Sequence, residues 1–154
     1  MCLVKHAQPA SPAETTAFRL GVLGTLVTDR FAARIEALDL KPKHAGLLTV
    51  LHQLGSASQQ EVAKLMGVAP SLIVVFADHL ERLQAIQRVR DPHDRRRQVL
   101  TLTGRGRELL ASCAQIADEV GQEFTSELTA KQRAALDDAL GVLVSRLMAG
   151  PPAS

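Results

Sequence analysis

The chain has 154 residues, of which 46% are hydrophobic and 22% charged, and its formal net charge is +2. This length favours one domain with a sizeable core, and the composition is typical of a soluble globular protein. No run of about 20 apolar residues occurs, which excludes a helical membrane span. The N-terminus lacks a signal-peptide pattern, so we expect a cytoplasmic protein. With so small a net charge, binding to nucleic acid would have to rest on local clusters of arginine.

Two helices are predicted in the first third of the chain, after an irregular arm at residues 1–13. The first spans about residues 13–38, because apolar residues recur there at helical spacing. Its apolar positions are Leu20, Leu23, Val27, Phe31, Ile35 and Leu38. Pro42 is suited to open the second helix, which should end at Gly55. The apolar residues of that helix are Leu47, Leu48, Leu51 and Leu54.

A helix-turn-helix is predicted between residues 58 and 82. Ser58 and Glu61 form a capping-box pattern, in which each side chain bonds the main-chain N–H of the other, so a helix should begin at Gln59. Gly67 should end this helix, because glycine adopts positive φ without steric cost. Pro70 fits the first position of the next helix. The apolar side of the first helix is Val62, Ala63, Leu65 and Met66.

The second of these helices has two apolar groups of residues. One group lies on a single face and should pack against the preceding helix; it comprises Ile73, Phe76, Ala77 and Leu80. The other group, Leu72, Val74 and Val75, points elsewhere. Valine cannot hydrogen-bond a base edge, although it can contact a thymine methyl group. These three residues are therefore expected either to contact DNA in this apolar way or to pack on a partner element.

A β-hairpin with a basic tip is predicted next. Residues 86–89 and 98–102 have β-forming character, and they flank the turn-rich segment RDPHDRRR. The hairpin and its tip carry Arg88, Arg90, Arg95, Arg96 and Arg97. A basic hairpin that directly follows a helix-turn-helix is typical of a wing that enters a DNA groove, and we prefer this interpretation to an ordinary solvated charged loop.

Two further helices are predicted after the hairpin. In the first, starting at Thr103 or Gly104, the apolar positions are Leu109, Cys113, Ile116, Val120 and Phe124. Thr129 should cap the second, which ends near Gly150. Its apolar positions are Leu136, Leu140, Leu143, Val144 and Leu147. A small winged helix cannot bury all of these stripes, so the surplus, with the first helix, predicts a homodimer interface.

The central third of the chain resembles the MarR family of bacterial transcription regulators. The resemblance rests on Gly67-Val68, on Asp91-Pro92 with Asp94-Arg95-Arg96, and on Leu102-Thr103-x-x-Gly106. It implies one mainly α-helical domain over residues 1–154: a winged-helix lobe at about 42–103, with a small β-hairpin wing, and dimerisation helices at about 13–38 and 104–149. Gln84 stands where the family usually has glycine, which predicts a different ending for the recognition helix.

The resemblance also implies a function, namely a homodimeric repressor on a palindromic operator that is released by a small anionic aromatic effector. In the family, the arginine matching Arg96 enters the minor groove, and the aspartate matching Asp94 steadies the wing; we expect an ion pair between them. The predicted DNA-binding residues are Ser71, Leu72, Val74, Val75, His79, Arg88, Arg90, Asp94, Arg95, Arg96 and Arg97. The predicted effector-binding residues are Arg19, Arg30, His44 and His52.

Other functions are weighed against this one. No nucleophile motif, phosphate loop or metal-ligand cluster is visible, so no enzyme, cofactor or metal is predicted. The alternative from another class is a protein-interaction module that uses the apolar surface of Leu72, Val74 and Val75. A third is a thiol-based redox sensor. That alternative would use Cys2 or Cys113, although Cys113 lies on an apolar stripe and is better explained as a core residue.

Overall fold

The computed structural model describes residues 10–148. Cys2, most of the N-terminal arm and the predicted helix end at Gly150 lie outside these residues. By its internal contacts the chain divides between Val120 and Gly121 into two compact units, each described here by itself. The prediction of a single domain stays a prediction. In the described part of the chain, no single helix is long and apolar enough to cross a membrane.

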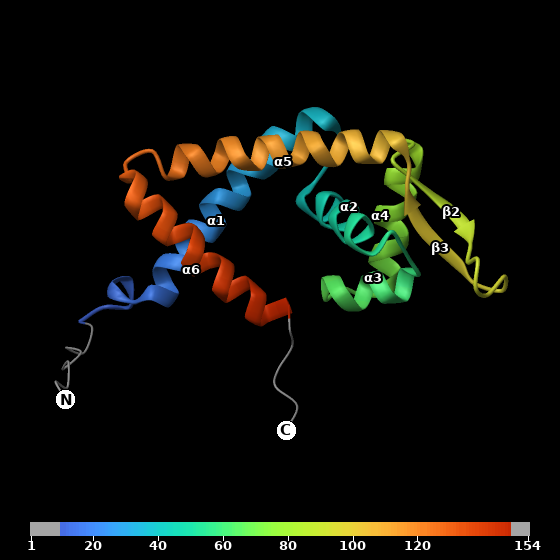
Figure 1. Cartoon of the computed structure of the whole chain (residues 1–154), viewed down its shortest axis with the longest axis horizontal. Helices are drawn as coiled ribbons and strands as arrows, with labels where there is room; N and C mark the ends of the chain where they lie inside the picture. The colour runs from blue at the N-terminus through green and yellow to red at the C-terminus, as the bar shows by residue number, and fades with distance from the viewer. Residues whose placement is uncertain (1–9, 149–154) are drawn as a thin grey trace, which may run out of the picture. The chain divides into compact units, whose positions relative to one another are not determined.

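The elements follow one another as the sequence predicts (Figure 1). The helices of the first unit are α1 (Thr16–Ile35), α2 (Pro42–Leu54), α3 (Gln59–Met66), α4 (Pro70–Arg82) and most of α5 (Gly104–Phe124). Short 3-10 turns occupy Pro12–Glu14 and Glu36–Leu38. The strands are β1 (Ser56–Ala57), β2 (Ile86–Arg90) and β3 (Gln98–Leu102). The mainly α-helical winged fold is confirmed.

The sheet has three antiparallel strands in the order β1-β3-β2, one more than the predicted hairpin. Ile86 pairs with Leu102 at one end of the hairpin, and Arg90 pairs with Gln98 at the other. The extra strand β1 has two residues, and Ala57 pairs with Leu100. A strand of two residues has no hydrophobic period to detect, so the sequence did not predict it.

Local signals set the helix boundaries as expected. Ser58 Oγ accepts a hydrogen bond from the Glu61 N–H at 3.3 Å, and Glu61 Oε2 accepts from the Ser58 N–H at 2.7 Å. Gly67 ends α3 at φ 62°, and Pro70 opens α4. Leu65 is the exception among the apolar residues assigned to α3, because its side chain is exposed. Only two turns long, α3 offers one narrow face to the core, and Val62 and Ala63 occupy it.

The core of the first unit is formed by α1 to α5 and the sheet. Its largest fully buried side chains are Ile35, Leu47, Leu48, Leu51, Val62, Ile73, Leu80, Ile86, Leu100 and Val120. Burying each such side chain stabilises the fold by roughly 1.5–3 kcal/mol. On α4, Ile73, Ala77 and Leu80 face inward while Leu72, Val74 and Val75 remain exposed. The predicted division of this helix into two apolar groups is therefore confirmed.

The end of α4 differs from the sequence prediction. Gln84 adopts φ 57°, the left-handed conformation that a glycine would adopt most readily. Leu80 C=O accepts from the Ala85 N–H at 2.9 Å, which closes the helix. The prediction that α4 would end differently because Gln84 replaces the family's glycine is therefore wrong. Two interactions hold Gln84 in this conformation. One is the hydrogen bond that closes the helix, and the other is donated by Thr103 Oγ1 to the Gln84 carbonyl at 2.5 Å.

Thr103 and Gly106 join the hairpin to α5. Thr103 Oγ1 accepts from the Gly106 N–H at 3.0 Å and so caps the helix. A Cβ on Gly106 would lie 1.9 Å from the Ala85 carbonyl oxygen, so only glycine fits there. The Leu-Thr-x-x-Gly pattern in the sequence therefore has a physical basis, because the backbone of α5 lies directly on the loop after α4.

The second unit consists of the last residues of α5 and helix α6 (Ala130–Met148). Thr129 Oγ1 accepts from the Gln132 N–H at 3.3 Å, which confirms the predicted cap. Apolar residues of α6 remain exposed, namely Leu140, Val142, Leu143 and Val144.

Candidate nucleic-acid interface

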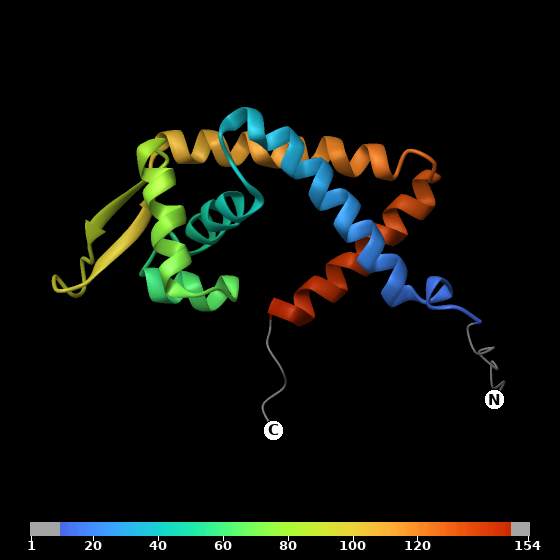
Figure 2. The same ribbon diagram turned by 180° about the vertical axis from the view of Figure 1, so that it is seen from behind.

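The α4 helix and the β2–β3 hairpin form the candidate DNA-binding surface. Both belong to the first unit, and the hairpin extends beyond the helices in both views (Figures 1 and 2). Ser71, Leu72, Val74 and Val75 lie exposed on the first two turns of α4. Their exposure is what contact with base edges in a major groove requires.

Two aspartates shape the tip of the wing. Asp91 Oδ1 accepts from the His93 N–H at 2.9 Å, and Asp94 Oδ1 accepts from the Arg96 N–H at 3.0 Å. Such side-chain bonds to the following backbone stabilise tight turns. The expected ion pair between Asp94 and the Arg96 guanidinium is absent from the described residues. Asp94 instead accepts a hydrogen bond from the backbone of Arg96.

The arginines of the hairpin differ in what they contact. Among residues 10–148, the guanidinium groups of Arg90, Arg95 and Arg96 form no ion pair, and all three residues are exposed. Arg97 Nη2 lies 3.5 Å from Glu61 Oε2 on α3. The two hydrogen bonds from Ser58, together with Arg97, lower the pKa of Glu61. The charged form of the carboxylate is therefore favoured, and it faces Arg97 at the base of the wing.

Arg88 is placed differently from the prediction. Its guanidinium forms ion pairs with Asp78 and Glu81, both on α4, and its side chain is only 20% exposed. Neither acidic residue was singled out in the sequence. Their spacing of three on one helix face was the available signal.

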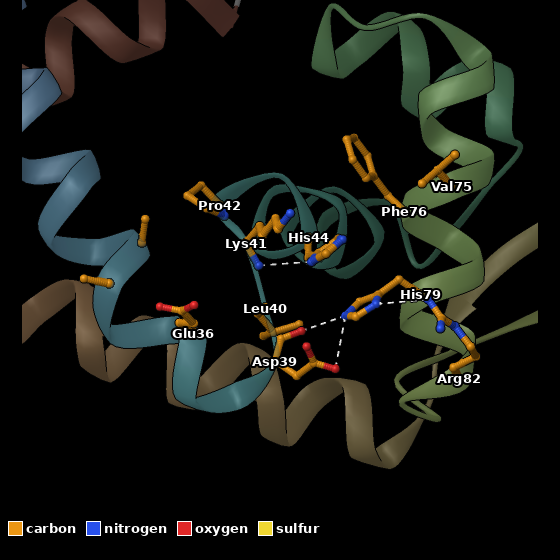
Figure 3. A pocket seen from close by; sticks show the side chains of 12 residues that line it. Glu36, Asp39, Leu40, Lys41, Pro42, His44, Val75, Phe76, His79 and Arg82 are labelled. Atoms are coloured by element: carbon orange, nitrogen blue, oxygen red, sulfur yellow. Dashed lines mark hydrogen bonds and ion pairs between the residues drawn. The ribbon is translucent and has the colours of Figure 1, made fainter.

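A pocket of about 600 Å³ lies beside the candidate surface (Figure 3). The end of α1, the start of α2 and the exposed side of α4 enclose it. Its lining residues are Ala32, Ala33, Glu36, Asp39, Leu40, Lys41, Pro42, His44, Val75, Phe76, His79 and Arg82. Of the four predicted effector-binding residues, only His44 lines this pocket. Arg19, Arg30 and His52 are not among its lining residues.

Two stacked histidines line the pocket wall. The rings of His44 and His79 are 4.4 Å apart with an interplanar angle of 11°, and Phe76 meets His44 edge-on. His79 Nε2 lies 2.6 Å from the Asp39 carbonyl oxygen, which can only accept, so this nitrogen carries the proton. His79 Nδ1 accepts from Arg82 at 3.3 Å. The predicted DNA contact His79 thus links α4 to the junction between α1 and α2.

His44 is the buried member of this pair. Its Nδ1 accepts from the Lys41 N–H at 3.0 Å, and the residue is 6% exposed. Burial, reinforced by the nearby His79 and Lys41, lowers the pKa of His44 to about 4. The ring is therefore neutral at physiological pH, and a positive charge on it is disfavoured.

We expect acid to destabilise the protein through His44. In the unfolded chain its pKa is about 6.5, so between this value and about 4 the unfolded state binds more protons. The contribution of His44 to the free energy of unfolding is complete above pH 6.5. It is lost as the pH falls towards 4, by about 3 kcal/mol in all. Urea unfolding at pH 7.0 and 4.5 measures it. His44→Gln keeps an acceptor for Lys41 without titrating, and an unchanged pH dependence in this variant would contradict the assignment.

Cys113 lies on the buried face of α5. It is 3% exposed, and burial raises the pKa of its thiol. A sensor thiol needs access and a lowered pKa, so the environment of Cys113 favours a core role. In the part of the chain that the structure describes, no three potential metal ligands cluster.

A basic wing, an exposed recognition helix and a pocket beside that helix are the features of a winged-helix, DNA-binding transcription regulator. The MarR family profile matches residues 40–97, which span α2 to the wing. Through this core the chain is similar to the MarR family. The curated relatives that it matches are named as transcription regulators.

Curated relatives are similar to this chain in sequence, and solved structures are similar to it in fold. The transcriptional regulator HosA of Escherichia coli O111:H- is 29% identical over 96 residues, which cover 60% of this chain and 68% of HosA. The structure of apo MarR from E. coli matches with a TM-score of 0.76 at 20% identity, over 84% of this chain and 96% of MarR. CouR from Rhodococcus jostii RHA1, bound to p-coumaroyl-CoA, matches with a TM-score of 0.72 at 23% identity, over 88% and 95%.

Proposed function

We propose that the chain is a repressor that binds a roughly palindromic operator as a homodimer. The observation that carries this proposal is the wing beside an exposed recognition helix. Arg90, Arg95 and Arg96 are exposed there, and they form no ion pair with any other residue of the described range 10–148. Arginine in a wing is attracted to phosphates and to narrow, A·T-rich minor grooves. A regulator of this kind acts on chromosomal DNA, so we expect it in the cytoplasm.

Exposed apolar surface in each unit supports a homodimer. On α1, Phe18, Leu20, Val22, Leu23 and Leu26 are all at least 43% exposed. On α6, the exposed apolar residues include Leu140 and Leu143. Apolar surface on this scale marks an interaction site, and a second copy of the chain is the simplest partner. Two-fold symmetry in the protein predicts two-fold symmetry in the operator.

Replacing Arg96 tests the role of the wing. Arg96→Ala should lower the affinity for promoter DNA beside its own gene about tenfold, and should flatten its salt dependence, because fewer counterions are released. Binding is measured over a salt series on promoter and mixed-sequence duplexes. Arg30→Ala removes the same charge from α1 and should bind as wild type does. Unchanged binding by Arg96→Ala would remove the wing from the mechanism.

The same titration distinguishes the competing function. The exposed Leu72, Val74 and Val75 would also suit a protein-interaction module. Such a module would show weak DNA binding without preference for the promoter, whereas a regulator keeps a preference for one sequence as affinity falls with salt.

We infer that the pocket beside α4 binds a small aromatic acid. Its volume lies within the range of ligand sites, roughly 300–1,000 Å³, and Phe76, Pro42 and Leu40 provide apolar walls. Lys41 and Arg82 supply positive charge for a carboxylate. CouR, which was crystallised with an aromatic acyl thioester, offers a precedent on this fold. Because His79 joins α4 to Asp39, a ligand that disturbs this bond would shift the recognition helix.

A thermal-shift screen tests the pocket. Benzoate and cinnamate should raise the melting temperature of the wild-type protein, because a ligand that binds only the folded state stabilises it. Lys41→Gln/Arg82→Gln should lose this shift. His52→Gln, outside the pocket, is the matched control and should keep it. If no aromatic acid raises the melting temperature or weakens DNA binding, the pocket is not an effector site for this class of compound.

A further inference from the structure

A cluster of three charged side chains connects α4 to the wing. Arg88 Nη2 on β2 lies 2.5 Å from Asp78 Oδ1, and Arg88 Nη1 bonds Glu81 Oε2. Both terminal nitrogens of the guanidinium thus face carboxylates. With its side chain 20% exposed, Arg88 is the least exposed member of the cluster, whereas the side chains of Asp78 and Glu81 are 56% and 42% exposed.

The two carboxylates lie on the stripe of α4 that contains Val74, one of the exposed residues of the candidate DNA-binding surface. Asp78 follows Val74 by four residues, and Glu81 follows Asp78 by three, so these side chains share one stripe of the helix. Val74 belongs to the exposed apolar group. Negative charge beside the groove-facing residues repels phosphates, which opposes the attraction that the wing arginines provide.

We propose that Arg88 is a positioning residue for DNA binding, which masks the carboxylates of Asp78 and Glu81 and fixes the base of the wing to α4. It does so without contacting DNA itself. The cluster carries one positive and two negative charges, and loss of Arg88 leaves both carboxylates unpaired on the binding face. This role replaces the direct DNA contact predicted for Arg88 from the sequence.

A double-mutant cycle separates masking from direct contact. Arg88→Gln is measured in the wild-type chain and in Asp78→Asn/Glu81→Gln, with a mixed-sequence DNA duplex as probe, since masking acts on phosphates of any sequence. We expect Arg88→Gln to weaken binding about tenfold in the wild-type background and less than twofold in the neutralised background. An equal loss in both backgrounds would mean that Arg88 contacts DNA and would overturn the proposal.

Two controls exclude a purely structural effect. Exposed ion pairs contribute at most about 1 kcal/mol to folding, so urea unfolding of Arg88→Gln should change little. Arg88→Lys retains the charge and should recover most of the affinity, which a role in folding geometry alone would not predict. Arg105→Gln breaks a comparable exposed pair with Glu108, 3.3 Å long, and should leave the salt dependence unchanged. A salt dependence altered equally by Arg105→Gln and Arg88→Gln would also contradict the masking role.

Discussion

Gly106→Ala is expected to destabilise the protein by about 3 kcal/mol or more, because the added methyl group has no room. Its Cβ would lie 1.9 Å from the Ala85 carbonyl oxygen and 2.9 Å from the Ala85 carbonyl carbon. These are backbone atoms, which no rotamer change can move. To relieve the clash, α5 must shift away from the loop that ends α4, and the Thr103 bonds that join the two are then strained or lost.

Chemical unfolding of Gly106→Ala beside Gly104→Ala measures this effect. Gly104 starts the same helix, and a Cβ there meets no atom within 4 Å. Alanine favours helix over glycine by up to about 1 kcal/mol, so Gly104→Ala should be neutral or slightly stabilising. If both variants unfold at the same denaturant concentration, the close approach of α5 to Ala85 does not contribute to stability.

The second large effect is expected at the proposed dimer interface. Leu140→Asp/Leu143→Asp places two carboxylates on the exposed apolar face of α6, where the wild-type residues are 39% and 49% exposed. An unpaired charge buried in an apolar interface costs several kcal/mol, which exceeds what the association can supply. The variant should sediment as a monomer at micromolar concentration. Its affinity for promoter DNA should fall about a hundredfold or more, because a monomer binds with one wing and one recognition helix instead of two of each.

The control adds the same charge to the other side of the helix. Val142 and Ser145 lie roughly opposite Leu140 and Leu143, given about 100° per residue. Val142→Asp/Ser145→Asp should remain dimeric and bind DNA. A wild-type protein that sediments as a monomer, or a double aspartate variant that remains a dimer, would show that this face of α6 is not the interface.

The helix-turn-helix could be predicted because its boundaries depend on neighbours in the chain. The cap at Ser58, the left-handed Gly67 and the opening proline Pro70 each act within four residues, so local physics decides them. The same holds for the Thr129 cap of α6. The β-hairpin followed from two β-forming stretches around a turn, and its paired strands differ from the prediction by one residue at Arg90.

Prediction from the sequence was less complete for the candidate site. The wing arginines Arg90, Arg95 and Arg96 and the apolar group on α4 are exposed, as the sequence pattern predicts. Arg88 was assigned to DNA together with the other hairpin arginines, since a strand of five residues does not reveal which side chains reach a neighbouring helix. The effector residues were chosen by charge and helix membership alone, and only His44 lines the pocket.

The sequence by itself determined the order of the helices, the caps that start α3 and α6, and the basic tip of the wing. Tertiary structure alone decided which charges are free and which are paired. His79 meets Asp39 across 40 positions of the chain, and Arg97 meets Glu61 across 36. Such contacts depend on how helices pack after the core is buried, and an ion pair forms only where that packing brings two side chains within about 4 Å.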